Sequence, residues 1–89
     1  MNEEIYEAIE RALEKNRIDE DVDDVLLELG EAIQEGGEGS RTVTIKYKKV
    51  AVEASGRCEA DEEDEEEFYV WIDEIRIGKE VIEIHDYVM

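Results

Sequence analysis

The first part of the chain places its hydrophobic side chains at the spacing of one helical face in two successive stretches. Residues 2–17 predict an amphipathic helix that Asn2 can cap. Residues 19–35 predict a second helix, which ends at two glycines. The apolar positions are Ile5, Ala8, Ile9, Ala12 and Leu13 in the first and Val22, Val25, Leu26, Leu29, Ala32 and Ile33 in the second. Because the link between them is short, the sequence predicts an antiparallel helical hairpin.

The hydrophobic period changes from that of a helix to that of a strand after the glycine-rich joint at residues 36–40. Hydrophobic and polar residues alternate over residues 41–54, which predicts one strand with one buried face. The alternation changes parity near Lys48 and Lys49. We interpret the change as a bulge or bend within one strand, and a tight turn is the alternative.

The C-terminal part of the chain predicts two further strands, at about residues 67–77 and 80–88. Residues 78–79 are Gly-Lys, which suits a two-residue hairpin turn between them. Simple pairing across that turn would set an aspartate opposite an isoleucine near residues 73–74. Either a bulge at that point or a longer loop would correct the pairing, and the sequence leaves both open.

These elements together predict one α+β domain over residues 1–89. The helical hairpin is expected to cover one face of a three-stranded antiparallel β-meander, in the order ααβββ. A chain of 89 residues leaves little room for a second domain.

Composition changes this picture by restricting the partners. The chain has 28 Asp or Glu residues against 10 Lys or Arg residues, for a formal net charge of −18. Duplex DNA, RNA and anionic membranes are poor direct partners, because their phosphates are bound by Lys and Arg. The sequence shows no signal peptide or membrane-spanning run, and its one cysteine cannot form an internal disulfide. We therefore expect a cytoplasmic protein.

The charge is distributed unevenly along the chain. Residues 1–40 hold 14 acids and three bases, net −11, and residues 58–89 hold 13 acids and two bases, again −11. Residues 41–57 hold one acid and five bases, net +4. We expect Lys46 and its basic neighbours to neutralise the acidic loop at residues 58–67 across the sheet.

Signals for catalysis, metals and cofactors are weak. His85 and Cys58 are the only residues of their types, too few to bind zinc, and we expect a plain strand histidine and a partly exposed structural thiol. The aspartates that start at Asp19 fail the calcium-loop pattern at its sixth and twelfth positions. We predict a protein that is not an enzyme and has no catalytic residue, metal site or cofactor.

Regularly spaced carboxylates are the strongest functional signal. Helical neighbours three or four residues apart lie roughly 5–6 Å from each other, so such rows can imitate the charges of a phosphate backbone. The predicted rows are Glu3, Glu7, Glu10 and Glu14 on the first helix and Asp21, Asp24, Glu28, Glu31 and Glu35 on the second. In composition and size, the chain resembles the small acidic DNA-mimic inhibitors that phages and mobile elements encode against host nucleases.

This pattern predicts a protein-binding module whose partner presents a basic surface. The acidic loop could contribute contacts through Glu62, Glu63, Glu65 and Glu66. A structural or assembly component is the first alternative, with Tyr69, Trp71 and Tyr87 at an interface or between copies of the chain. For these three aromatics, however, we expect a place in the core or under the helices. Adaptation to high salt is the second alternative.

A salt-adapted protein would require salt to fold, whereas a binding module would not. Ten isoleucines and a Glu excess of 20 over 8 Asp favour the binding module. We therefore expect circular dichroism at about 10 mM salt to show the same helix and strand content as at about 1 M, where the Debye length has shortened to roughly 3 Å. Loss of structure at low salt would instead support salt adaptation.

Overall fold

The computed structural model describes residues 2–64 and 66–89. The first amphipathic stretch forms α1 (Glu3–Lys15), as predicted. Its start is capped by Asn2, whose side-chain oxygen accepts a hydrogen bond of 3.1 Å from the amide of Ile5. This bond satisfies one of the amides that the first helical turn leaves unpaired.

The second predicted helix is α2 (Val22–Glu35), and the chain beyond it completes its C-terminal end. The last turn of α2 carries no Lys or Arg of its own. The guanidinium group of Arg41 supplies this charge by donating a hydrogen bond to the carbonyl of Ile33. A Cβ atom at Gly36 would collide with that guanidinium, so the glycine leaves room for it.

The prediction of one strand over residues 41–54 is wrong, because this segment folds as a hairpin. β1 (Gly39–Tyr47) and β2 (Val50–Ala60) pair antiparallel around a turn at Lys48 and Lys49. Lys48 has a φ of 59°, which short hairpin turns require of a central residue. The change of parity thus marks a turn, and the sheet has four strands instead of three.

The remaining strands are β3 (Phe68–Ile77) and β4 (Glu80–Tyr87), so the sheet is a meander in the order β1-β2-β3-β4. The predicted two-residue turn before β4 is confirmed, with Gly78 at a φ of 59°. β2 continues to Ala60 because it pairs with β1 on one side and β3 on the other. The acidic loop therefore spans residues 61–67, and is shorter than predicted.

The pairing conflict around Asp73 is resolved by a bulge, which is one of the two alternatives. The register between β3 and β4 shifts between Ile72 and Glu74, and that between β2 and β3 shifts between Ser55 and Gly56. The bulge lets the hydrophobic residues on both sides of it face the same side of the sheet.

Gly56 lies where β2, β3 and α2 approach one another closely. A Cβ atom at this position would lie 2.2 Å from the backbone oxygen of Trp71 and 3.1 Å from the side chain of Ile33. Only glycine leaves space for both the displaced backbone of β3 and the helix that packs over it.

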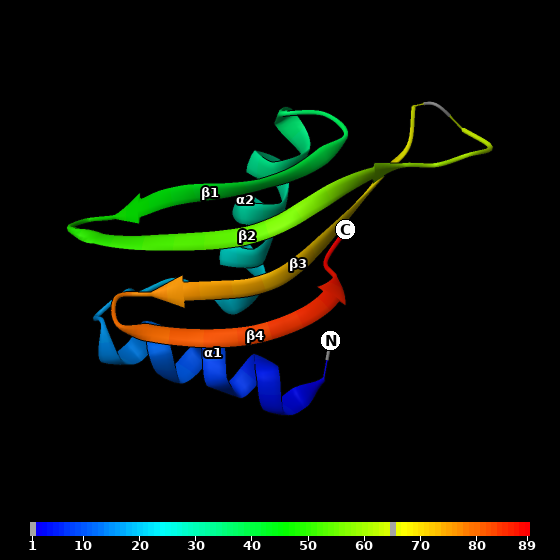
Figure 1. Cartoon of the computed structure of the whole chain (residues 1–89). Helices are drawn as coiled ribbons and strands as arrows, with labels where there is room; N and C mark the ends of the chain where they lie inside the picture. Colours follow the sequence, from blue (N-terminus) through cyan, green and yellow to red (C-terminus); the bar gives the residue numbers. More distant parts are fainter. Residues whose placement is uncertain (1, 65) are drawn as a thin grey trace.

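Both helices cover the same face of the sheet, as predicted, but they do not form an antiparallel hairpin. In Figure 1, α1 runs alongside β4 while α2 crosses the strands behind the sheet. Each helix contacts the sheet more than it contacts the other helix. Arg17, with a φ of 57°, and the buried Ile18 redirect the chain between them. The core consists of Ile9, Ala12, Leu13, Ile18, Val22, Val25, Leu26, Leu29, Ile33, Val52, Ala54, Cys58, Val70, Ile72, Ile75, Ile77 and Ile84.

The close approach at Gly56 predicts a large effect of a single methyl group. We expect Gly56→Ala to lower the free energy of unfolding by roughly 1–3 kcal/mol, because the backbone of β3 must move to accept it. Urea denaturation followed by circular dichroism measures the change. Ala51→Ser, at an exposed position of the same strand, is the control and should change stability little. An unchanged midpoint for Gly56→Ala would contradict the packing.

Candidate functional site

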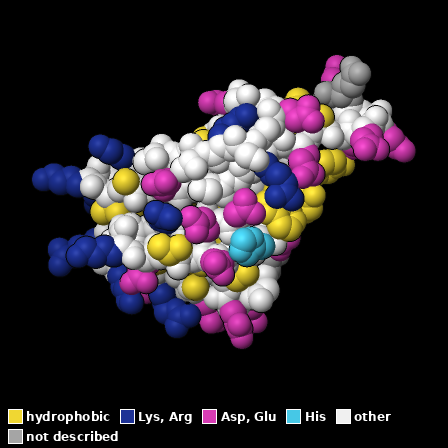
Figure 2. Space-filling model, in the orientation of Figure 1, with side chains coloured by type: hydrophobic (Ala, Val, Ile, Leu, Met, Phe, Trp, Pro, Cys, Tyr) yellow, Lys and Arg dark blue, Asp and Glu magenta, His cyan; other side chains and the backbone are white. Residues whose placement is uncertain are grey.

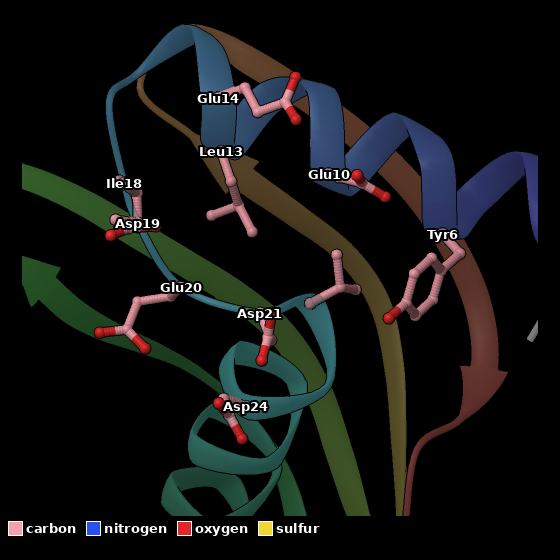
Figure 3. Close-up of a pocket in the computed structure, with 10 residues that line it drawn as sticks. Tyr6, Glu10, Leu13, Glu14, Ile18, Asp19, Glu20, Asp21 and Asp24 are labelled. Atoms are coloured by element: carbon pink, nitrogen blue, oxygen red, sulfur yellow. The ribbon is translucent and has the colours of Figure 1, made fainter.

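The nine helical carboxylates predicted as a binding surface are all exposed to solvent. Two of them on α1 and two at the start of α2 line a groove between the helices with a volume of about 450 Å³. In Figure 3, Glu10 and Glu14 extend from α1, and Asp21 and Asp24 lie at the first turn of α2. We call this feature the acidic groove. Its lining consists of Tyr6, Glu10, Leu13, Glu14, Ile18, Asp19, Glu20, Asp21, Val22 and Asp24.

The structure brings together only part of the predicted rows. The two helices run in different directions in Figure 1, and the outer members of each row do not line the groove. The row carboxylates outside the groove are Glu3, Glu7, Glu28, Glu31 and Glu35. The linker between the helices adds Asp19 and Glu20 to the lining of the groove, although the helical spacing did not predict these two residues.

The row carboxylates are little neutralised by positively charged side chains of the protein itself. Within residues 2–64 and 66–89, none of the nine forms an ion pair with a lysine or arginine. Glu28 instead accepts a hydrogen bond from the hydroxyl of Tyr47, which joins α2 to the end of β1. Burial, followed by this hydrogen bond, raises the pKa of Tyr47 well above its ordinary value. The groove therefore presents negative charge that an external cation can neutralise.

Lysines gather at the end of the molecule where the two hairpin turns lie, on the left of Figure 2. Lys15 of α1, Lys49 of the first turn and Lys79 of the second line one groove of about 470 Å³. Lys15 also pairs with Glu80 at 3.4 Å. The other end of the β1–β2 hairpin leads to the acidic loop, so the expected neutralisation of that loop by lysines is wrong.

The lysines of β1 approach the linker between the helices. Lys46 and Lys48 line a small groove of about 230 Å³ together with Asp19 and Glu20. The linker end of the acidic groove is thus bordered by positive charge. The carboxylates of α1 and of the first turn of α2 do not line this small groove with Lys46 and Lys48.

The acidic loop is organised by its own aspartates. Asp61 accepts a hydrogen bond of 2.9 Å from the amide of Glu63, and Asp64 accepts one of 3.0 Å from the amide of Glu66. The loop candidates Glu62, Glu63 and Glu66 are exposed, and Glu65 lies outside the described residues. Loop and acidic groove do not share lining residues, so they are separate candidate surfaces.

The two residues considered for chemistry lie in different environments. Cys58 is buried in the core, so the expectation of a partly exposed thiol is wrong, and burial raises its pKa. His85 is exposed in β4 with a φ of 50°, where the register between β3 and β4 shifts, and its Nδ1 lies 3.5 Å from a carboxylate oxygen of Asp73. Over the described residues, no three His, Cys, Asp or Glu side chains are grouped to hold a metal ion. The groove carboxylates are therefore spread over a surface and do not converge on one point.

Three aromatic side chains lie outside the core, contrary to expectation. Tyr69, Trp71 and Tyr87 project from the face of the sheet that the helices leave open. Their parity along the strands, opposite to the buried Val70 and Ile72, is the sequence signal that could have placed them. The sequence predicted helices on only one face of the sheet, but we did not place these three side chains on the open face.

Comparison with known proteins finds no family model, curated protein or solved structure that matches the chain. In the described part of the chain, neither helix has the length and apolar character needed to cross a bilayer. The functional argument accordingly rests on the geometry of the exposed surfaces.

The hydrogen bonds of Asp61 predict a pH dependence. Bonds from the amide of Glu63 and then the hydroxyl of Tyr69 hold the pKa of Asp61 below its ordinary value. A lowered folded pKa stabilises the fold above the ordinary carboxyl pKa of about 4, and this contribution is lost as the pH falls through the folded pKa.

We expect Tyr69→Phe to raise the pKa of Asp61, because one of the hydrogen bonds that lower this pKa is removed. Carbon-13 NMR titration of the side-chain carboxyl measures the midpoint. Tyr47→Phe, which removes a hydroxyl bonded to Glu28 on another element, is the control and should leave Asp61 unchanged. A midpoint for Asp61 that does not move in Tyr69→Phe would contradict the bond.

Proposed function

We propose that the protein is a non-enzymatic binding module whose acidic groove binds a basic surface of a protein partner. The observation that carries the proposal is the meeting of two helices at a groove lined by six carboxylates. Its concave shape allows several of them to contact one protruding basic element. The groove carboxylates are Glu10, Glu14, Asp19, Glu20, Asp21 and Asp24.

Within the described residues, no groove carboxylate forms an ion pair with a lysine or arginine, which supports an external partner. Carboxylates on adjacent helical turns lie roughly 5–6 Å apart and repel one another by a few tenths of a kcal/mol per pair. A partner that supplies lysines or arginines would relieve this repulsion. It would also gain in association rate from the long-range attraction of a protein with net charge −18.

We further propose that the partner's basic surface is one that holds nucleic acid. Spaced, exposed carboxylates on a rigid helix offer negative charge of the kind that a phosphate-binding surface recognises. Lys46 and Lys48 border only the linker end of the groove, at Asp19 and Glu20, so the carboxylates of α1 and of the first turn of α2 remain available to such a surface. A reducing compartment such as the cytoplasm fits the unpaired thiol of Cys58.

A matched pair of variants tests the groove. The groove variant Glu10→Gln, Glu14→Gln, Asp24→Asn and the loop variant Glu62→Gln, Glu63→Gln, Glu66→Gln each remove three negative charges. Captured partners from the source cell are identified by mass spectrometry, and the affinity of a purified partner is then measured for each variant. We expect the groove variant to weaken binding by about tenfold or more, since three charge-assisted contacts are lost.

The loop variant is the control for net charge and should weaken binding by no more than about threefold at 0.15 M salt. Duplex DNA added as a competitor should displace the protein from its partner. Equal losses for the two variants would show that only net charge matters, and would overturn the groove. A partner that binds DNA and this protein simultaneously would overturn the nucleic-acid-mimic part alone.

A further inference from the structure

The open face of the sheet carries an aromatic cluster made of Tyr69, Trp71 and Tyr87. Tyr69 and Tyr87 are 42% and 47% exposed, although large side chains of small domains are usually needed in the core. The ring of Tyr87 meets those of Trp71 and Tyr69 edge to face, with centroid distances of 4.9 Å and 6.3 Å. Tyr69 and Trp71 lie on the strand face opposite the buried Val70 and Ile72, and none of the three aromatics lines the acidic groove. Tyr87, beside Trp71 at the edge of the sheet, also lines a groove with residues of both helices.

Carboxylates hold every polar atom of the aromatic cluster. The hydroxyl of Tyr69 donates to Asp61 at 2.9 Å, and the hydroxyl of Tyr87 donates to a nearby glutamate at 3.2 Å. The indole N–H of Trp71 donates to Asp73 at 2.7 Å. These bonds fix the rings and leave ring faces and carboxylate oxygens as the available contacts. Both of these contacts attract cations.

The chain itself shows which cation this surface accepts. The guanidinium group of Arg57 lies 4.7 Å from the ring centroid of Trp71, and its Nε is 2.6 Å from an oxygen of Glu59. The second carboxylate oxygen of Glu59 accepts a hydrogen bond from the hydroxyl of Tyr87. At Tyr69 a carboxylate again lies beside an aromatic ring, because Asp61 accepts a hydrogen bond from the hydroxyl of Tyr69. Within the described residues, Arg57 is the one cation placed over a ring.

We propose that the aromatic cluster is a second binding surface, which takes an arginine side chain from an exposed basic segment of a partner protein. A planar guanidinium can stack on a tyrosine ring and donate hydrogen bonds to a carboxylate at the same time. An ammonium group combines these two contacts less well. Stacked nucleic-acid bases suit the site poorly, because Glu59, Asp61 and Asp73 would repel their phosphates. The proposal shares with the proposed function a basic protein partner, but it uses the opposite face of the sheet.

Trp71 makes the surface directly measurable, because it is the only tryptophan in the chain. The probe is a blocked Gly-Arg-Gly-Arg-Gly peptide, titrated into the whole protein at 0.15 M and 0.5 M salt. We expect a saturable change in Trp71 emission, and shifts of the Trp71 indole resonance and of neighbouring amides in NMR spectra. A citrulline peptide keeps the shape without the charge and should give no response. A lysine peptide should bind about two- to fivefold more weakly.

Variants distinguish binding at the aromatic cluster from attraction by the net charge of the protein. Tyr69→Leu with Tyr87→Leu keeps Trp71 as the reporter and should weaken arginine-peptide binding by about fivefold or more at 0.5 M salt. The groove variant is the matched control, and should leave the Trp71 response unchanged at that salt, where its charges are screened. The NMR map on the unsubstituted protein provides the test if the leucine variant does not fold.

Each outcome decides the proposal. Equal responses to the arginine and citrulline peptides, or NMR shifts confined to the acidic groove, would overturn it and leave the proposed function standing. A response to a single-stranded thymidine oligonucleotide but not to the arginine peptide would assign the rings to base stacking, and would also overturn it. Binding at the cluster together with a groove variant that keeps full partner affinity would overturn the proposed function alone.

Discussion

One-sided burial of the sheet is the constraint on which the rest of the structure depends. Two helices cover one face of four strands, and the buried side chains of both layers meet there. Alternation along each strand then forces every second residue onto a face that only water covers. No buried residue of the described chain is polar or charged, so the acids among the described residues are carried outside this layer. The acidic groove and the aromatic cluster are the two surfaces that this separation produces.

The bulge at Asp73 makes that alternation possible over the full length of β3. Without the extra residue, Ile75 and Ile77 would face the opposite side from Val70 and Ile72. The bulge also places the carboxylate of Asp73 beside the indole of Trp71 at 2.7 Å. A feature required by packing thus helps to fix an exposed ring, which connects the core to the open face.

The charge of −18 is compatible with this fold because no charged side chain of the described residues is buried in the core. The hairpin turns and the end of α1 collect lysines at one end of the molecule, while the groove acids form no ion pair with a lysine or arginine among the described residues. Contacts that join elements, such as Arg41 to the end of α2 and Tyr47 to Glu28, use polar groups at the border of the core. The carboxylates that such ion pairs leave over at the groove form the surface that we assign to a basic partner.

The sequence by itself determined the α+β class, both helices, the turn before β4 and the exposure of the helical carboxylates, because hydrophobic period and turn chemistry are local properties. It did not show that Lys48 turns the chain, since a parity change can mark either a bulge or a turn and we had favoured the bulge. Only the tertiary structure decided how the helices cross, which carboxylates share a groove and where the lysines gather. It alone left Tyr69, Trp71 and Tyr87 uncovered, because coverage of a sheet face depends on how many elements pack against it, which no local pattern encodes.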